Sequence, residues 1–279
     1  MDIATFLALV TSNDMVGLEI GPSHAPRFPK RDGWRIETVD HASAEELRAK
    51  YAGAGVAIDS IEDVDYISDG QPLHEVVPRR GYYDFVYSSH VIEHIPDFVS
   101  YFKSCELLLK PGGQILLTVP DKRFCFDALQ NASTTGEVLQ AYHDKRTRHT
   151  IGQVFDFGAS MAQLDGAQSW SSDRIGTVGL INDFTEAKRH YDLVRSHHGY
   201  LDYHGWRFTP SSFRLVIFDL HQLGILEVQE SMVVQSVVDF HVALSRVGRG
   251  AGKSRIELLR DIVAEQIESG RQLLSGLNA

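Results

Sequence analysis

Acidic, imidazole and hydroxyl side chains, with turn-forming Gly and Pro among them, stand in this chain at the points where short apolar runs stop. These positions are Glu19, Gly21, Pro22, Ser23, Asp40, His41, Ser89 and His90. A carboxylate accepts hydrogen bonds from hydroxyl or ammonium groups, and an imidazole exchanges protons near neutral pH. A glycine such as Gly21 lets the backbone approach a bound molecule closely. The pattern predicts a polar ligand held at the ends of several buried strands.

A second group of polar residues could supply a base. Asp121 follows a further apolar run, His94 comes just after His90, and both His149 and His204 lie in a polar segment farther along. Transfer of a group to an oxygen nucleophile needs a base within hydrogen-bond reach. A structural role competes in each case, because Asp121 could cap a helix or hold a turn and the histidines could pack or lie at the surface.

Two further clusters are weaker candidates. Asp202, His204 and Asp121 could hold a divalent cation, but no spacing fixes a set of ligands, so we assign no metal site. Arg146 and Arg148 form a basic cluster in an acidic chain. They could bind a phosphate or carboxylate of a substrate, although a solvated surface is the simpler interpretation.

Hydrophobic periodicity places these residues on alternating strands and helices. We expect strands over residues 15–20, 33–40, 61–67, 83–89 and 114–119, and a closing pair at 225–228 and 233–244 with its turn near Glu230. We expect helices over residues 44–51, 98–109, 210–223 and 254–274, and one near the N-terminus that covers the first strand. This alternation predicts an α/β fold with an open, mostly parallel sheet, whose ligands lie at the carboxyl ends of the strands.

The chain divides into three parts by its composition and by its alternation of predicted strands and helices. Residues 1–121 and 206–247 carry the α/β pattern, whereas residues 122–205 are polar, aromatic and rich in histidine. A structureless loop of that length is uncommon, so we expect a helical cap with helices near 136–145 and 183–195. Residues 254–279 form an amphipathic helix that could pack on the body or on a second subunit of a homodimer. The glycine-rich segment 248–253 resembles a phosphate loop only superficially.

The composition narrows the classes of partner. The 279 residues carry a formal net charge of −10, which argues against a general nucleic-acid surface. No apolar run approaches the roughly 20 residues of a membrane-spanning helix, so we expect a soluble, cytoplasmic protein without a membrane partner. The two cysteines, Cys105 and Cys125, fit reduced thiols of which one or both are buried.

Four segments together resemble the class I S-adenosylmethionine-dependent methyltransferases. They are Leu18-Glu-Ile-Gly-Pro, Val39-Asp40, the stretch from Tyr83 to Asp97 that contains His-Val-Ile-Glu-His, and Leu108-Leu-Lys-Pro-Gly-Gly. Within that class the chain is most similar to a bacterial group with a His-Val-x-Glu-His segment after the fourth strand. The resemblance implies a Rossmann-like sheet of seven strands with the last one antiparallel, a helical cap insertion, and S-adenosylmethionine as the cofactor.

The resemblance also implies a role for individual residues. Gly21 and Glu19 would lie beside and beneath the amino-acid part of the cofactor, and Asp40 would accept the ribose hydroxyls. The implied cofactor-binding residues are Glu19, Gly21, Pro22, Ser23, Asp40, His41, Asp65, Tyr66, Ser89 and His90, with Asp65 and Tyr66 near the adenine. Ser23 and Ala25 replace two glycines of the usual turn, which predicts a stiffer turn or a cofactor that lies slightly farther away.

The resemblance leaves the acceptor open. We favour methylation of a hydroxyl oxygen on a small molecule or a sugar or glycan, the sugar by analogy with the bacterial group alone. The candidate catalytic residues are Asp121, His94, His149 and His204, and the resemblance implies that Asp121 faces the substrate. A small-molecule N- or C-methyltransferase is one alternative. A regulatory protein that binds S-adenosylmethionine without catalysis is another, because the glycine turn is weakened.

Overall fold

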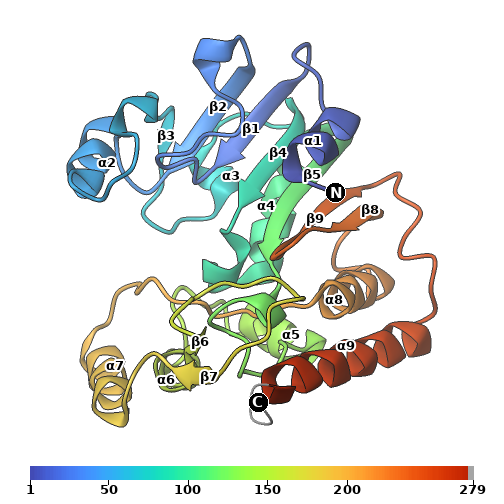
Figure 1. Ribbon diagram of the computed structural model, residues 1–279. Coiled ribbons are helices and arrows are strands. Elements are labelled where there is room, and N and C mark those ends of the chain that lie inside the picture. The colour runs from blue at the N-terminus through green and yellow to red at the C-terminus, as the bar shows by residue number, and fades with distance from the viewer. Residues whose placement is uncertain (276–279) are drawn as a thin grey trace.

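The computed structural model describes residues 1–275, and a mixed sheet of seven strands forms its centre (Figure 1). The strands are β1 (Val16–Ile20), β2 (Arg35–Asp40), β3 (Tyr66–Ile67), β4 (Tyr83–Ser89), β5 (Leu109–Pro120), β8 (Gln229–Gln235) and β9 (Asp239–Ser245). Their order across the sheet is β3-β2-β1-β4-β5-β9-β8. The first five strands are parallel, and β9 runs antiparallel to both of its neighbours. The Rossmann-like α/β sheet expected from the sequence is therefore confirmed.

The strand order changes direction at β1, which lies between β2 and β4. Ile20 at the end of β1 pairs with Val39 on one side and with Ser88 on the other. The residues that follow these three strands therefore meet at one edge of the sheet. Ligands of open α/β sheets bind at such a switch point, beyond the carboxyl ends of the strands.

Both faces of the sheet are buried, as parallel strands require. Along β4 the side chains alternate, so that Phe85 and Tyr87 join a cluster beneath α1 and Val86 joins the larger core on the other face. The helices outside the insertion are α1 (Ile3–Val10), α2 (Ala44–Tyr51), α3 (Leu73–Val76), α4 (Phe98–Leu108), α8 (Pro210–Gln222) and α9 (Arg255–Ser275). Helices α2 and α8 begin at capping boxes formed by Ser43 and Thr209.

Residues 122–205 form the insertion, which Figure 1 shows below the sheet. Its elements are α5 (Thr135–His143), α6 (Ile151–Ser160), β6 (Ala162–Leu164), β7 (Val178–Leu180) and α7 (Phe184–Ser196), with β6 and β7 paired antiparallel. The insertion starts where β5 ends, and Asp121 forms a bridge with Phe208 on the returning chain. It therefore lies next to the carboxyl edge of the sheet, where a cap would meet a ligand. The division into core and cap domains remains a proposal.

The strand predicted over residues 61–67 is confirmed only at its end. Over residues 61–67 only Tyr66 and Ile67 pair with β2. The polar groups before them contact side chains instead, because the carbonyl of Asp63 accepts from Lys30 Nζ and the carbonyl of Ile61 accepts from Arg48. Pairing with another strand is therefore confined to the last two residues of the predicted run.

The closing strands are also displaced from their predicted positions. Residues 225–228 pair with no strand, because the backbone N–H groups of Glu227 and Val228 donate to Glu106 Oε1 at 2.7 and 2.8 Å. The turn between β8 and β9 lies at residues 236–238, where Ser236 N donates to the carbonyl of Asp239. Glu230, predicted near the turn, lies within β8 and forms an ion pair with Arg214.

The two cysteines are free thiols and buried, as predicted. Helix α9 packs alongside α8, where Ser211 donates to Glu265 and Arg255 pairs with Asp219 (Figure 1). Within residues 1–275, none of the helices has the length and apolar character needed to cross a membrane.

Candidate active site

Glu19 fixes the turn that follows β1. Its side chain is buried, and its two carboxylate oxygens accept hydrogen bonds from the backbone N–H groups of Arg27 at 2.8 Å and Phe28 at 3.2 Å. Burial raises the pKa of Glu19 to about 7, against these two hydrogen bonds, which lower it. The segment 21–28 is thereby folded back onto the end of β1, so the turn is shaped by the chain itself.

The turn after β1 has Ser23 where the usual turn has a glycine, but its backbone keeps the conformation that glycine favours. Gly21 has a φ of 68°, and Ser23 has a φ of 50°, in the left-handed region that favours glycine. Ser23 N donates to Asp40 Oδ2 at 2.8 Å, which helps to hold this conformation. Pro22 lies between them, and its carbonyl accepts from Ala25 N at 2.9 Å. Asp40 thus supports the backbone path that glycines provide elsewhere.

Asp40 is buried at the end of β2 and accepts three hydrogen bonds from the chain. Besides Ser23 N, the backbone N–H of His41 and its ring Nδ1 lie 2.8 and 2.7 Å from Oδ1. His41 Nε2 lies 3.0 Å from Lys50 Nζ at the surface. A carboxylate offers about four lone pairs, so one acceptor position remains. A contact to both ribose hydroxyls would require Asp40 to release one of its present donors.

Asp65 and Tyr66 are engaged by other side chains. Asp65 Oδ2 accepts from Lys30 Nζ at 2.6 Å and from the backbone N–H of Thr38 at 2.8 Å. The hydroxyl of Tyr66 donates to Glu37 at 3.1 Å. These contacts tie the approach to β3 onto β2. A role for either residue next to an adenine stays a prediction.

His90 turns the chain away from the end of β4, just after Ser89. It has a φ of 53°, and its backbone N–H donates to the carbonyl of Thr118 in β5. Its Nε2 lies 3.2 Å from Asp239 Oδ1 and its Nδ1 lies 3.8 Å from Glu93 Oε1. Burial opposes the charged imidazole, but the hydrogen bond to Asp239 and the charge of Glu93 outweigh it and raise the pKa of His90.

Glu93 lies at the centre of the histidine cluster. Only 1% of its surface is exposed, and neither carboxylate oxygen accepts a hydrogen bond from any residue within 1–275. Its nearest cationic groups are His90 at 3.8 Å and His94 at 4.0 Å. The backbone carbonyl of Glu93 accepts from the N–H groups of Gly205 and Trp206. This pairing brings the end of the insertion against the segment that follows β4.

His94 and His204 meet beside Glu93 with their rings edge to face, 4.6 Å apart. His94 Nδ1 lies 2.8 Å from Asp202 Oδ1 in an ion pair that also holds Asp202 at the surface. Burial opposes protonation of His94, but the contacts to Asp202 and the charge of Glu93 raise its pKa. The same contact to His94 lowers the pKa of Asp202 well below its usual range.

His204 is oriented by a second carboxylate. Its Nδ1 lies 2.6 Å from Asp127 Oδ2, and both side chains are buried. The other oxygen of Asp127 accepts from Gln130 Nε2 at 2.8 Å, so this carboxylate is itself fixed. With Nδ1 engaged, the free nitrogen of His204 is Nε2. This arrangement can orient a histidine that acts as a base or as a metal ligand.

His149 completes the cluster from the insertion. It is buried next to the ring of Tyr200, and neither of its ring nitrogens has a hydrogen-bond partner in the described part of the chain. Burial, with the nearby charge of His94, lowers its pKa to about 4. His149 is therefore a neutral imidazole at physiological pH, and both nitrogens are available to a ligand.

Asp121 is occupied in a structural ion pair. It is fully buried and both of its oxygens accept from the guanidinium of Arg123, while Gln235 donates to Oδ2 at 3.0 Å. It also caps the short turn after β5 through Arg123 N. The contacts of both Asp121 oxygens to Arg123 and Gln235 leave no lone pair free for an acceptor or a cation, so the catalytic role of Asp121 stays a prediction.

The structure brings His94 and His204, both candidates from the sequence, together with Glu93, Asp127 and Asp239, which the sequence analysis did not single out. Glu93, His94 and His204 each offer one metal-ligand atom, and these atoms lie within 4.8 Å of one another. Glu93 stands inside the quoted His-Val-Ile-Glu-His segment, but its burial has no sequence signal. The roles of Asp127 and Asp239 have no sequence signal either. Asp127 reaches His204 only through the folding of the insertion, and Asp239 reaches His90 only through the position of β9.

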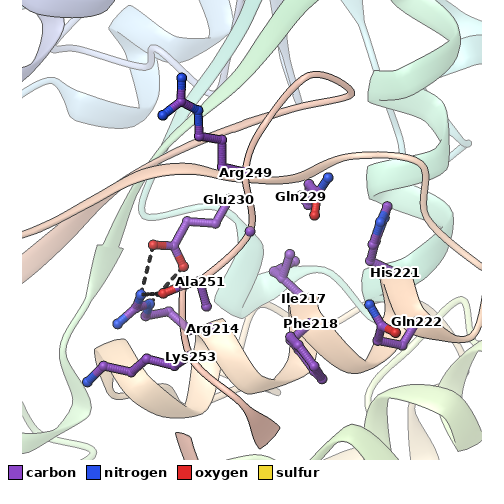
Figure 2. Close-up of a pocket in the computed structure, with 12 residues that line it drawn as sticks. Arg214, Ile217, Phe218, His221, Gln222, Gln229, Glu230, Arg249, Ala251 and Lys253 are labelled. Carbon is purple, nitrogen blue, oxygen red and sulfur yellow. Dashed lines mark hydrogen bonds and ion pairs between the residues drawn. The ribbon is translucent and has the colours of Figure 1, made fainter.

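A cavity of about 320 Å³ lies elsewhere, between α8 and the glycine-rich segment after β9 (Figure 2). Arg214 crosses it to pair with Glu230 and with the carbonyl of Ala251. Glu230 pairs through β9 with the amino end of β5. The cavity therefore lies at the edge opposite the histidine cluster, and we place no acceptor in it.

Comparison with known proteins adds to this geometry. A family model described as a methyltransferase domain matches residues 2–167. The ubiquinone biosynthesis O-methyltransferase of Acinetobacter baumannii is 32% identical over 92 residues, which cover 31% of this chain and 39% of that protein. The enzyme of the same description from Acinetobacter baylyi is 38% identical over 48 residues, or 17% of this chain and 20% of that protein. The alignments thus span well under half of these relatives.

Solved structures align with a larger part of the chain. A SAM-dependent methyltransferase from Aquifex aeolicus is 11% identical with a TM-score of 0.40, over 87% of this chain and 88% of that one. An S-adenosylmethionine-dependent methyltransferase from Mesorhizobium loti is 13% identical with a TM-score of 0.41, over 86% and 95%. Likenesses of this size carry no argument about the acceptor.

Proposed function

Because the chain belongs to the class I S-adenosylmethionine-dependent methyltransferases, we propose that it methylates a hydroxyl oxygen on a small molecule or a sugar residue. The observation that carries this proposal is the cluster of His94 and His204, each backed by a carboxylate, around the buried Glu93. An alcohol is a poor nucleophile until its proton is removed. An amine acceptor, once neutral, would need no such cluster.

The turn after β1 supports the cofactor assignment. A Cβ added at Gly21 would come within 3.0 Å of Val91, so the backbone here approaches the segment after β4 more closely than a side chain allows. Asp40 keeps an acceptor position for a ribose hydroxyl. Glu19, ionising near neutral pH, places a negative charge beneath the turn, where an ammonium group would be attracted. When bound, S-adenosylmethionine supplies an electrophilic methyl group on a sulfonium.

In this proposal His204 takes the acceptor proton. Asp127 holds the proton of His204 on Nδ1, so Nε2 is left with a lone pair for the hydroxyl proton. The buried Asp127 stabilises the imidazolium that results, as in other carboxylate-histidine pairs. His94 is the weaker candidate for the base, because its partner Asp202 is 72% exposed in its side chain and screened by water.

We also propose four further properties of this chain. They are the sugar or glycan as acceptor, a homodimer, a location in the cytoplasm, and insertion residues 122–205 as the part that selects the acceptor. The rival interpretations are N- or C-methylation and cofactor binding without catalysis. The left-handed Ser23 weighs against the last, because the turn keeps a glycine-like path without the glycine.

The first test is calorimetric titration of the full chain with S-adenosylmethionine and with its demethylated product. We expect both to bind, and failure of both would overturn the cofactor assignment. The second test follows labelled methyl groups into pooled phenols, polyols and sugars, with an amine pool as the matched comparison. Transfer to amines alone would exclude O-methylation, and binding without transfer to any pool would favour the non-catalytic alternative.

A further inference from the structure

We propose that Glu93, His94 and His204 bind one divalent transition-metal ion at the carboxyl edge of the sheet. The set joins one carboxylate to two imidazoles, which suits ions such as Zn²⁺, Co²⁺ or Fe²⁺ better than Mg²⁺ or Ca²⁺. The binding claim does not depend on the proposed function. The role assigned to the ion below does rest on that function.

The positions of the ligand atoms support the site. One atom from each residue lies within 4.8 Å of the other two, and Glu93 Oε1 is 4.0 Å from His94 Nε2. Metal–ligand bonds of about 2.0–2.2 Å need donors that lie somewhat closer together. Small side-chain rotations close that difference, because the backbones of Glu93 and of residues 205–206 are already joined by hydrogen bonds.

The second nitrogen of each histidine supports it as well. His204 Nδ1 forms a hydrogen bond of 2.6 Å with Asp127, whereas His94 Nδ1 lies 2.8 Å from Asp202 Oδ1 in an ion pair without hydrogen-bond geometry. In both rings this leaves Nε2 for a metal, and His94 Nε2 lies 4.0 Å from Glu93 Oε1. Histidines that bind metals almost always have the other nitrogen engaged by a carboxylate or carbonyl, which fixes the ring and its tautomer. The His204–Asp127 pair has this arrangement, and the His94–Asp202 ion pair adds a second carboxylate beside the same cluster.

Glu93 is the independent observation that points to a ligand. It is 1% exposed and neither of its oxygens accepts a hydrogen bond within residues 1–275. Burial of a carboxylate without hydrogen bonds is strongly unfavourable unless a counter-charge compensates. A bound cation supplies that compensation and uses the lone pairs that are left over.

Three protein ligands leave coordination positions open for the acceptor. The ion would bind the acceptor hydroxyl there and lower its pKa, as it does for bound water. The hydroxyl proton passes to water, the oxygen–carbon bond forms, and the carbon–sulfur bond breaks with its electron pair left on sulfur. In the metal-bound protein His204 is a ligand, so the ion replaces it in activating the oxygen.

The test uses the full chain freed of metal by dialysis against a chelator. Titration with Zn²⁺ by calorimetry and with Co²⁺ by visible absorption should give one ion per chain. Glu93→Gln and His204→Ala should abolish metal binding over the concentrations at which the parent is saturated. Asp127→Asn should weaken the affinity for the metal by about 10- to 100-fold. His198→Ala is the matched control, because His198 is an exposed histidine outside the cluster, and it should bind as the parent does.

Folding of each variant is checked by binding of the demethylated cofactor and by thermal unfolding. If a ligand variant fails to fold, the Asp127→Asn titration and the ligand-field spectrum of the Co²⁺-loaded parent carry the test. No saturable binding, or binding unaffected by Glu93→Gln and His204→Ala, would overturn the site. Methyl transfer that is undiminished after chelation would overturn the activating role while leaving the proposed function intact. Ion binding without any methyl transfer would support the site and count against the proposed function.

Discussion

The two sides of the candidate site differ in how their buried polar groups are satisfied. Beneath the turn after β1, Glu19 and Asp40 accept hydrogen bonds on both carboxylate oxygens. Beside the insertion, Glu93 and His149 are equally buried, but neither the carboxylate oxygens of Glu93 nor the ring nitrogens of His149 have a hydrogen-bond partner within residues 1–275. The first side is shaped by the chain itself, whereas the second keeps polar atoms that are available to a ligand.

The difference matters because an unsatisfied buried polar group destabilises the folded chain by about 1–3 kcal/mol. The side at the turn after β1, which we propose as the cofactor side, avoids this loss and is preorganised. The side beside the insertion, which we propose as the acceptor side, carries the loss, as functional sites often do. Changes on the cofactor side should therefore alter affinity for the cofactor, and changes on the acceptor side should alter turnover.

The largest expected effect comes from His204→Ala. Whether His204 acts as a base or as a metal ligand, its loss should lower kcat by about 10²- to 10⁴-fold. The dissociation constant of S-adenosylmethionine should stay unchanged, because His204 makes no contact with the turn after β1. Steady-state kinetics and calorimetry measure the two quantities. The kcat of Asp127→Asn should fall between those of the parent and of His204→Ala. If either variant lost affinity for S-adenosylmethionine as strongly as it lost kcat, the two sides of the site would not act separately.

The same comparison shows what the sequence could predict. The turn at Gly21, the acid at Asp40 and the break at His90 follow directly from apolar runs that stop at polar residues. Strand ends in a parallel sheet meet at one edge, so their proximity also follows from the predicted fold. The cofactor side is therefore largely readable from local pattern.

The contacts of the proposed acceptor side could not be predicted from local pattern. His204 lies far along the chain from Glu93, and their contact depends on the path of the whole insertion. Asp127 reaches His204 for the same reason. The misplaced strands at 61–67 and 225–228 share this cause, because side chains such as Glu106 satisfy backbone groups that a pattern assigns to a strand. Contacts of this kind belong to the tertiary structure and leave no periodic signal.

The second expected effect concerns Glu19 and pH. Its pKa is raised in the folded protein from 4.5 to about 7 by burial, so the folded chain holds this proton more tightly than the unfolded chain. The stabilisation is complete below pH about 4.5 and is lost as pH rises toward about 7. The contribution amounts to at most about 3 kcal/mol. Nearby Arg27 lowers this pKa and Glu62 raises it.

Denaturant titrations of the parent and of Glu19→Gln, at several pH values between about 5 and 8, isolate this contribution. The stability of the parent relative to the variant should fall as pH rises. If the ammonium of S-adenosylmethionine lies near Glu19, it favours the charged carboxylate. Saturating cofactor should then make the difference in unfolding free energy between parent and variant less dependent on pH. A difference that is independent of pH would show that Glu19 ionises normally despite its burial.

The third effect concerns affinity for the cofactor. Asp40→Asn removes the charge and one of the acceptors that hold Ser23 and His41, so the dissociation constant of S-adenosylmethionine should rise about 10- to 100-fold. Asp65→Asn is the matched comparison, because Asp65 is engaged by Lys30 and Thr38. A smaller change is expected there. Equal effects would support the predicted place of Asp65 near the adenine.

The smallest effects come from a pair of glycine substitutions, one on each side. Gly21→Ala places a side chain at a φ of 68° and within 3.0 Å of Val91, which should weaken cofactor binding through about 1–2 kcal/mol of backbone strain. Gly205→Ala adds a Cβ that would lie 2.4 Å from His149 Nδ1, so His149 must move.

For this pair we expect opposite signatures. Gly21→Ala should raise the dissociation constant of S-adenosylmethionine with little change in kcat at saturation, because the strain acts on the turn alone. Gly205→Ala should lower kcat with the cofactor affinity retained, because it disturbs His149 and the chain that joins Glu93 to His204. Kinetics and calorimetry on the same two preparations give all four values. If both variants change the same quantity, the two sides are coupled, and the site must be treated as one unit rather than as a preformed turn beside a cluster that needs its ligand.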